Sequence, residues 1–214
     1  MRVNIGCGAT PTEGWVNLDN SWAVKAARQP LLLYGLKPFG ILGKQSLGLA
    51  AAARTENIQW ANAVRRIPCP DSAAEVVYSS HMIEHLDREE VRRLLAEVRR
   101  VLRPGGIVRL VAPDLSLLVD EYLRARDADE FVRRTHMTQP RPVGLPARLR
   151  AALIGPRHHL WMYDGASLSD LLHRAGFADA AVLPPGETAI ADPGSLDLKE
   201  RAEESVYVEA VNPR

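Results

Sequence analysis

Seven short apolar runs, each bounded by turn residues, alternate with helical patterns along this chain of 214 residues. This alternation restricts the fold more than any other feature, because it is typical of strand–helix–strand units that build a mostly parallel sheet. We predict strands at 2–5, 15–18, 58–61, 74–79, 107–112, 180–183 and 205–211. The chain has the length of one domain, and 46% of its residues are apolar, which suffices for a sizeable core. The sequence therefore predicts an α/β fold with helices on both faces of the sheet.

The clearest helix is predicted between the fourth and fifth strands. Asp87 can cap it, and Glu90 completes the Asp-x-x-Glu pattern of a capping box. One face of this helix is apolar and comprises Val91, Leu94, Leu95, Val98, Val101 and Leu102. Pro104-Gly105-Gly106 should end the helix and turn the chain into the fifth strand. Two further helices should begin near Asp114 and Ser167.

The first strand runs into Gly6-Cys7-Gly8, and the second strand ends in Asp19. A glycine turn lets a ligand approach the backbone, and a carboxylate at the end of the next strand can accept hydrogen bonds from both hydroxyls of a ribose. A dinucleotide site would need a third glycine where Pro11 stands, and no Walker phosphate loop is present. A nucleoside cofactor without phosphates fits this pair of features, and S-adenosyl-L-methionine (SAM) is such a cofactor. Gly-x-Gly taken alone is weak evidence, and without further features a structural turn would be the better interpretation.

The link between the first two strands, residues 9–14, is too short for the usual crossover helix. We predict a loop there, and a cofactor pocket that is left open on that side. The basic insertion after Asp19 should fold over the pocket.

Six segments appear in an order that carries a specific resemblance: NIGCG, NLDN, RRIPCPDSAAEVVYSSHMIEHL, EVRRVLRPGGIVRLVAPDL, HHLWMYDGASLSDLLHRAGF and SVYVEAV. Together they resemble the class I SAM-dependent methyltransferases of the type 11 family over most of the chain. The resemblance implies a Rossmann-like, doubly wound sheet of seven strands, mostly parallel with an antiparallel last strand. From the chain length and the two acid-free basic segments we predict a single domain, 1–214, with lid insertions at about 21–56 and 131–161.

The resemblance implies where each part of SAM would bind. The methionine part would lie against Gly6, Cys7 and Gly8, the ribose on Asp19, adenine beside Asn62 and Ala63, and the methyl end beside Ser80 and His81. Asn4 and Asn62 stand where the family often has an acid, which weakens a contact to the methionine ammonium but still allows a hydrogen bond to adenine.

Methyl transfer from a sulfonium depends mainly on the position of the acceptor, and a base with a pKa near neutrality helps a hydroxyl or amine acceptor lose its proton. His81, directly after the fourth strand, is the first candidate for this base, and His85 is the second. His158 or His159 could reach over the same pocket, with Tyr163 as a substrate contact. Each of these histidines could instead have only a structural role.

The segment from His81 to His85 also matches the H-x-x-E-H pattern of some zinc proteases. That chemistry needs a continuous helix and a third ligand, whereas the motif here follows directly after a strand. Some RNA-modifying methyltransferases hold a divalent ion with a Glu-His pair at this place, which would make Glu84 and His85 ligands. We favour the simpler interpretation, in which the pair caps or packs the turn, and predict no metal.

The acceptor is predicted from the distribution of charge. The net charge is only +1, so nothing suggests a general attraction to nucleic acid. Yet 20–55 and 131–163 contain basic residues and no acid, and both would cover the active site. We therefore predict O-methylation of a small or glycan-type anionic acceptor, in glycan biosynthesis. Apolar residues within 31–49 could make a peripheral membrane contact. The alternative is a non-catalytic domain that binds SAM or a partner.

Two features suggest the cellular location. Cys7 and Cys69 are the only cysteines and do not form a metal-ligand pair, which is typical of a reduced compartment. No charged and apolar leader precedes the first strand. A cytoplasmic location is the expectation, and the sequence makes no prediction of the oligomeric state.

Overall fold

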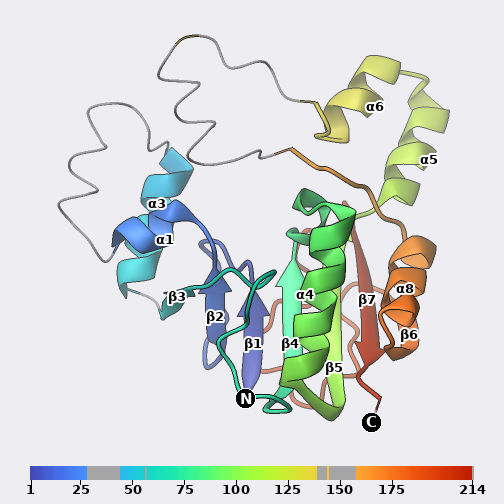
Figure 1. Cartoon of the computed structure of the whole chain (residues 1–214). Helices are drawn as coiled ribbons and strands as arrows, with labels where there is room; N and C mark the ends of the chain where they lie inside the picture. Colours follow the sequence, from blue (N-terminus) through green and yellow to red (C-terminus); the bar gives the residue numbers. More distant parts are fainter. Residues whose placement is uncertain (28–43, 56, 139–143, 145–157, 214) are drawn as a thin grey trace.

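Seven strands form one sheet in the order β3-β2-β1-β4-β5-β7-β6 (Figure 1). The computed structural model describes residues 1–27, 44–55, 57–138, 144 and 158–213. The strands are β1 (Arg2–Ile5), β2 (Val16–Asp19), β3 (Ile58–Trp60), β4 (Ala74–Ser80), β5 (Leu102–Pro113), β6 (Ala178–Leu183) and β7 (Ser205–Val211). Neighbours from β3 to β5 are parallel, whereas β7 runs antiparallel to both β5 and β6. The predicted sheet and its antiparallel last strand are confirmed.

β5 begins at Leu102, well before the predicted start at residue 107. Leu102 pairs with Ala74 of β4, and the Gly105 amide donates to the Asn212 carbonyl at 2.9 Å. Pro104-Gly105-Gly106 therefore ends the preceding helix as predicted, but these residues already belong to the sheet. The extension depends on a partner far along the chain, so local turn signals did not reveal it.

The described helices are α1 (Trp22–Ala27), α3 (Lys44–Thr55), the short 3-10 helix η2 (Ile83–His85), α4 (Arg88–Val101), α5 (Leu115–Ala125), α6 (Ala128–Arg134) and α8 (Gly165–Arg174). α4 has the predicted capping box, in which the Asp87 carboxylate accepts from the Glu90 amide and the Glu90 carboxylate accepts from the Asp87 amide. Its predicted apolar face is buried from Val91 to Val101, whereas Leu102, also predicted on this face, is the first residue of β5. α5 begins after Asp114 as predicted, and α8 begins two residues before the predicted Ser167.

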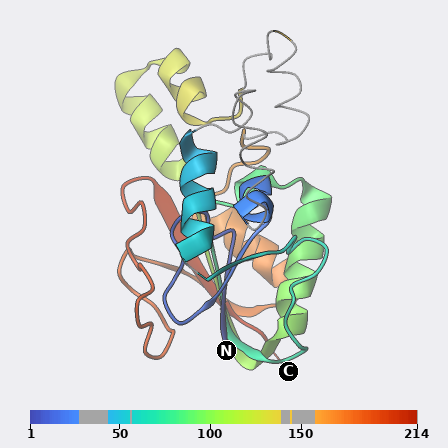
Figure 2. The same ribbon diagram turned by 90° about the vertical axis from the view of Figure 1, so that its left-hand side faces the viewer.

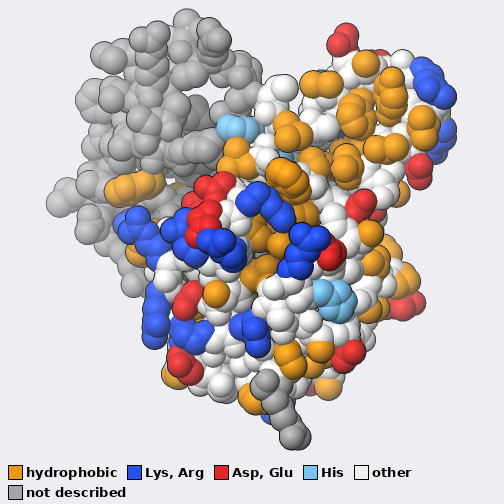
Figure 3. Space-filling view, turned by 45° about the vertical axis from the view of Figure 1, so that its right-hand side comes forward, with side chains coloured by type: hydrophobic (Ala, Val, Ile, Leu, Met, Phe, Trp, Pro, Cys, Tyr) orange, Lys and Arg blue, Asp and Glu red, His pale blue; other side chains and the backbone are white. Residues whose placement is uncertain are grey.

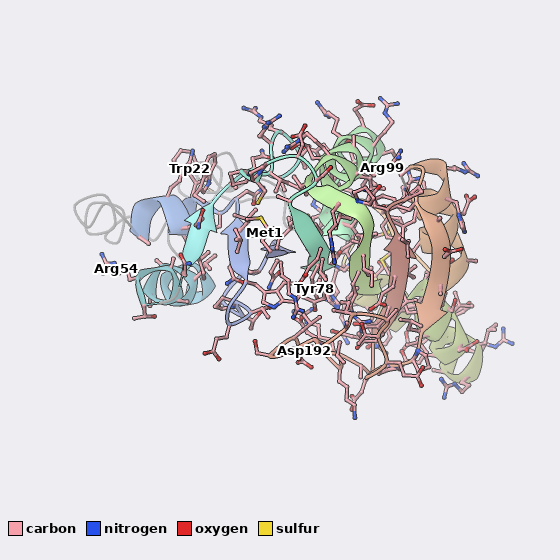
Figure 4. All side chains as sticks on the ribbon, turned by 90° about the horizontal axis from the view of Figure 1, so that it is seen from below. Met1, Trp22, Arg54, Tyr78, Arg99 and Asp192 are labelled. Atoms are coloured by element: carbon pink, nitrogen blue, oxygen red, sulfur yellow. The ribbon has the colours of Figure 1, made fainter. Side chains whose placement is uncertain are left out.

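The two faces of the sheet are covered differently. α4 and α8 pack on one face, while 184–204 crosses the other face without a described helix (Figure 2). Seen from below, Tyr78 and Asp192 lie on that second side, and Arg99 of α4 lies on the first (Figure 4). The expectation of helices on both faces is therefore wrong for this part of the sheet, because irregular chain takes the place of helices there.

A buried ion pair fastens the irregular segment 184–204 to the sheet. Arg109 of β5 is 0% exposed, and its Nη1 lies 2.6 Å from Oε1 of Glu209 on β7. The Glu209 carboxylate also accepts from Thr188 Oγ1 at 2.6 Å and from the Ala189 amide at 2.8 Å. A buried charge is tolerated only when it is paired and hydrogen-bonded, and this pair meets both conditions.

The link 9–14 is a loop, as predicted, and two buried amides hold it. Asn17 Oδ1 accepts from the Thr12 amide at 2.8 Å, and Asn17 Nδ2 donates to the Thr12 carbonyl at 2.9 Å. Asn4 Nδ2 donates to Thr12 Oγ1 at 3.0 Å. Asn4, at a position where an acid would be more usual, therefore stabilises this short connection between β1 and β2.

α5 and α6 form a hairpin that projects beyond the carboxyl ends of the strands (Figure 1). Hydrophobic side chains gather on its surface (Figure 3), and the exposed ones include Leu117, Val119, Leu123 and Val132. None of the described helices is long and apolar enough to cross a membrane.

Candidate active site

The carboxyl ends of β1, β2, β4 and β5 meet at one edge of the sheet (Figure 1). The order of the strands reverses direction between β1 and β4, and ligands of open α/β sheets bind in the crevice at such a point. The residues that follow these strands are the ones that the sequence predicted for the cofactor. The topology therefore brings the glycine turn, Asp19 and the Ser80-His81 step to the same edge.

The turn after β1 needs glycine for two physical reasons. Gly6 and Gly8 have φ of 71° and 54°, in the left-handed region that side chains disfavour. A Cβ on Gly6 would lie 2.7 Å from Met82 Cγ, whereas a Cβ on Gly8 would meet nothing within 4 Å among the described residues. Gly6 thus allows close packing inside the protein, and the backbone at Gly8 is open to a ligand.

Asp19 is the last residue of β2, and its carboxylate lies against the glycine turn that follows β1. Its Oδ2 accepts from the Gly8 amide at 3.1 Å, and its Oδ1 accepts from the Ser21 amide at 2.7 Å. Burial raises the pKa of this carboxyl above its usual value, although both hydrogen bonds oppose that shift. Each carboxylate oxygen can accept a second hydrogen bond. A carboxylate held against an open glycine turn fits the ribose of SAM.

The remaining cofactor candidates lie at the same edge of the sheet. Asn62 and Ala63 follow β3, and Asn62 Oδ1 accepts from the Val64 amide at 3.1 Å, which fixes this turn. The buried Ser80 hydroxyl at the end of β4 has no hydrogen-bond partner among the described residues. Contacts of these side chains with adenine or with the methyl end of SAM stay predictions.

A cavity of about 370 Å³ opens beside His81, between the carboxyl ends of β4 and β5 and the α5–α6 hairpin. Its walls are His81, Pro113, Asp114, Leu117, Leu118, Arg134, His136, His159, Arg201 and Glu204. A second cavity of the same size lies within the α5–α6 hairpin and contains none of the predicted site residues. The first cavity is therefore the candidate acceptor site.

The sequence did not predict Arg134, His136, Arg201 or Glu204 as site residues. Arg134 and His136 lie in the acid-free segment 131–163, which the charge pattern predicted to cover the active site without singling out either residue. Arg201 and Glu204 lie in a segment without a recognisable motif, and only the fold brings them to the cavity.

His81 is held in an unusual conformation at the cavity wall. Its φ is 49°, its Nε2 lies 2.8 Å from Ser205 Oγ, and its Nδ1 lies 3.2 Å from Arg201 Nη1. Because a guanidinium can only donate, Nδ1 accepts, and the neutral ring carries its proton on Nε2. Burial and the nearby Arg201 lower the pKa of His81 to about 3. This environment suits a positioning role, and a role as base stays a prediction.

The other catalytic candidates are placed differently. His159 also lines the cavity, and burial together with the neighbouring His85 lowers its pKa to about 4. His85 is on η2 and its Nδ1 lies 3.2 Å from the His158 carbonyl. Tyr163 is buried, its hydroxyl accepts from Arg88 at 3.3 Å, and it is not among the residues that line the cavity.

Large parts of both predicted lids, 28–43 and most of 139–157, lie outside the described residues. α1 and α3 come from the first lid segment and pack on each other beside β3. α6 comes partly from the second lid segment. How the lids cover the pocket stays a prediction.

Replacing Gly6 by Ala should reduce the free energy of unfolding by at least about 1–2 kcal/mol, because an L residue is strained at positive φ and Met82 must also move. Gly48→Ala is the matched control, since Gly48 lies in α3 with no atom near the added Cβ among the described residues. The control should be neutral or gain up to about 1 kcal/mol. Urea unfolding measures both, and a Gly6→Ala protein as stable as the wild type would contradict this account.

Comparison with known proteins agrees with this fold. Residues 43–110 match the family model of a type 11 methyltransferase domain. A SAM-dependent methyltransferase from Methanosarcina mazei has 15% identity and a TM-score of 0.53, and the alignment covers 99% of this chain and 92% of that one. A SAM-dependent methyltransferase from Thermotoga maritima, a possible histamine N-methyltransferase, has 16% identity and a TM-score of 0.49, with coverage of 99% and 81%. No curated protein matches the chain. At 15% identity, the Methanosarcina mazei structure supports the fold alone.

Proposed function

We propose that this chain, whose residues 43–110 match a type 11 methyltransferase domain, uses SAM to methylate a hydroxyl oxygen of a small anionic acceptor bound beside His81. The observation that carries the proposal is the polar cavity at the carboxyl ends of β4 and β5. SAM supplies an electrophilic methyl group when it is bound. The task of the chain is to hold the acceptor oxygen in line with that group.

The position of the cavity supports this assignment. His81 lines the cavity and directly follows Ser80, at the edge where β1 and β2 bring the glycine turn and Asp19. Gly6, Gly8 and Asp19 would hold SAM, with Asn62 and Ala63 beside its adenine. His81 would separate the two ligands, and its hydrogen bond to Ser205 would keep the ring in place.

Two guanidinium groups in the cavity wall offer contacts for an anionic acceptor, beside the carboxylates of Asp114 and Glu204. Arg134 and Arg201 carry these guanidinium groups. Arg201 pairs with Glu204 at 3.5 Å, and their side chains are 55% and 49% exposed, so this ion pair contributes little stability. A phosphate or carboxylate on the acceptor can therefore displace Glu204 from Arg201 at a small cost. A sugar phosphate or a carboxylated glycan unit has both this charge and a hydroxyl to methylate.

The proton of the acceptor hydroxyl needs a base. His81 and His159 line the cavity, but burial lowers their pKa values, and His81 Nδ1 already accepts from Arg201. The carboxylates of Asp114 and Glu204 line the same cavity and are further candidates to take up the proton. The proposed reaction is O-methylation in which His159 or one of these carboxylates receives the proton.

Replacing Arg134 by Gln should raise the KM for the acceptor by about 10- to 100-fold, because a hydrogen bond to a charged group contributes about 1.5–3 kcal/mol. Arg133→Gln is the matched control, since Arg133 is exposed, pairs with Glu130 and does not line the cavity. SAM affinity should stay the same in both variants. Equal effects of the two substitutions, or a parallel loss of SAM affinity in Arg134→Gln, would contradict the assignment of the cavity.

Release of S-adenosylhomocysteine tests the proposed function as a whole. The purified chain should release it when phosphorylated or carboxylated sugars are added and much less with their neutral counterparts. A domain that only binds SAM would release none with any acceptor. If the chain preferred neutral acceptors, methyl transfer would be supported and the proposal of an anionic acceptor would be wrong.

A further inference from the structure

Behind the cavity wall, three side chains converge on one point. Glu84, His85 and His159 each direct one ligand-type atom to it, and these atoms all lie within 4.8 Å of one another. His85 Nε2 is 3.8 Å and His159 Nε2 is 3.9 Å from Glu84 Oε1. These separations are too long for hydrogen bonds. We name these three residues the Glu84 cluster.

Glu84 is the feature that ordinary packing does not explain. It is 0% exposed, and neither carboxylate oxygen has a hydrogen-bond partner among the described residues. A buried carboxylate without a partner is strongly unfavourable. The two imidazole nitrogens at 3.8 and 3.9 Å from one oxygen indicate that a cation between them would satisfy the buried carboxylate of Glu84.

The surrounding backbone fixes the three side chains. The Glu84 carbonyl accepts from the Leu160 amide at 2.7 Å and from the Trp161 amide at 3.2 Å, which joins η2 to the segment that carries His159. His85 Nδ1 lies 3.2 Å from the His158 carbonyl. A carbonyl can only accept, so Nδ1 carries the proton and the lone pair of His85 is on Nε2, toward Glu84. Histidines that bind metals are oriented in this way by a backbone carbonyl.

We propose that Glu84, His85 and His159 bind one divalent transition-metal ion of the zinc type. Two imidazoles and one carboxylate are a ligand set that zinc uses, with a further position for water or another ligand. With bonds of about 2.0–2.2 Å at tetrahedral angles, the ligand atoms would be roughly 3.4 Å apart, so each histidine nitrogen needs to approach the Glu84 oxygen by about half an ångström. This assignment replaces the interpretation of Glu84 and His85 as a cap or as packing of the turn.

The neighbouring histidines do not belong to the ligand set. His81 Nδ1 is 3.7 Å from Glu84 Oε1, but Arg201 already donates to that nitrogen. His136 stacks edge-on against His159, with ring centroids 5.4 Å apart, and so supports a ligand from outside the cluster. Among the residues that the structure describes, the site therefore has three protein ligands.

Metal titration of the purified apo chain, without SAM or acceptor, tests this proposal. We expect one equivalent of Zn²⁺ to bind, and Co²⁺ in its place to give the visible ligand-field bands of a tetrahedral site. Glu84→Gln and His159→Ala should each weaken binding by at least about 100-fold, since even groups outside the ligand set contribute 10- to 100-fold. Glu84→Gln keeps the volume of the side chain, so it separates loss of the ligand from loss of folding.

His173→Ala is the matched control, because His173 is exposed in the last turn of α8 and should leave the affinity unchanged. Stoichiometric binding that both cluster variants lose and His173→Ala keeps would support the site. Absence of binding, or binding that survives in Glu84→Gln, would overturn it. Because no SAM or acceptor is present, either outcome is independent of the proposed methyl transfer.

Discussion

Replacing Asp19 by Asn is expected to abolish SAM binding at concentrations that saturate the wild-type chain. The carboxylate would accept hydrogen bonds from two ribose hydroxyls, and hydrogen bonds to a charged group contribute about 1.5–3 kcal/mol each. In the wild type, the Asp19 carboxylate accepts hydrogen bonds from the backbone amides of Gly8 and Ser21. In the variant, the NH2 group of the new side chain would face one of these N–H groups, and that hydrogen bond would be lost. Together these losses should weaken binding by at least about 100-fold. The rise in Tm on addition of SAM measures this directly.

Asp129→Asn provides the control for this experiment. Asp129 is an exposed acid in the first turn of α6 and lies far along the chain from the glycine turn. That variant should keep the full rise in Tm with SAM. If Asp19→Asn gave the same rise as the wild type, the ribose would have to bind elsewhere.

The affinity for SAM should also depend on pH through Asp19. Burial raises the pKa of this carboxyl in the free protein, and only the ionised form accepts both hydroxyl hydrogens. As the pH falls, SAM affinity should therefore begin to decline above the pH at which an ordinary aspartate is protonated. Titration calorimetry across the acidic range measures this decline, and an affinity that stays constant would argue against Asp19.

Replacing Glu209 by Ala is expected to have the largest effect on stability. The substitution leaves the guanidinium of Arg109, 0% exposed, without its partner, and breaking a buried ion pair in this way costs about 3–5 kcal/mol. It also removes the acceptor for Thr188 and Ala189, which hold 184–204 on the sheet. In a chain of this length the Tm should fall by about 10 °C.

Two further variants show whether loss of the Arg109–Glu209 ion pair causes the lower stability of Glu209→Ala. Glu203→Ala removes an exposed acid nearby and should change the free energy of unfolding by less than about 0.5 kcal/mol. Arg109→Met combined with Glu209→Leu removes both charges, so it should be less destabilised than Glu209→Ala. If Glu209→Ala and Glu203→Ala had the same free energy of unfolding in urea, the Arg109–Glu209 ion pair would not stabilise the fold.

The parts of the fold that were predicted correctly depend on local patterns. α4 is an example, because Asp87 and Glu90 are three residues apart and its buried face repeats at helical spacing. The seven strands lie where apolar runs meet turn residues. The loop at 9–14 was predicted from its length, although the sequence did not show that Asn4 and Asn17 hold it.

The parts that were missed depend on contacts between distant residues. Arg109 and Glu209 are 100 positions apart, and their pairing keeps irregular chain on a face where helices were expected. Arg201 meets His81 across 120 positions, which changes the chemistry expected of that histidine. His159 joins Glu84 only because backbone hydrogen bonds bring its segment to η2. Sequence patterns were enough to name candidate residues for binding the cofactor. The cavity proposed for the acceptor could be found only from the tertiary structure.

Isothermal titration of SAM and S-adenosylhomocysteine into the wild-type chain shows whether the protein binds the cofactor. We expect each ligand to bind with a stoichiometry of one, at the site that Gly6, Gly8 and Asp19 form. Failure to bind either ligand at millimolar concentration would contradict it.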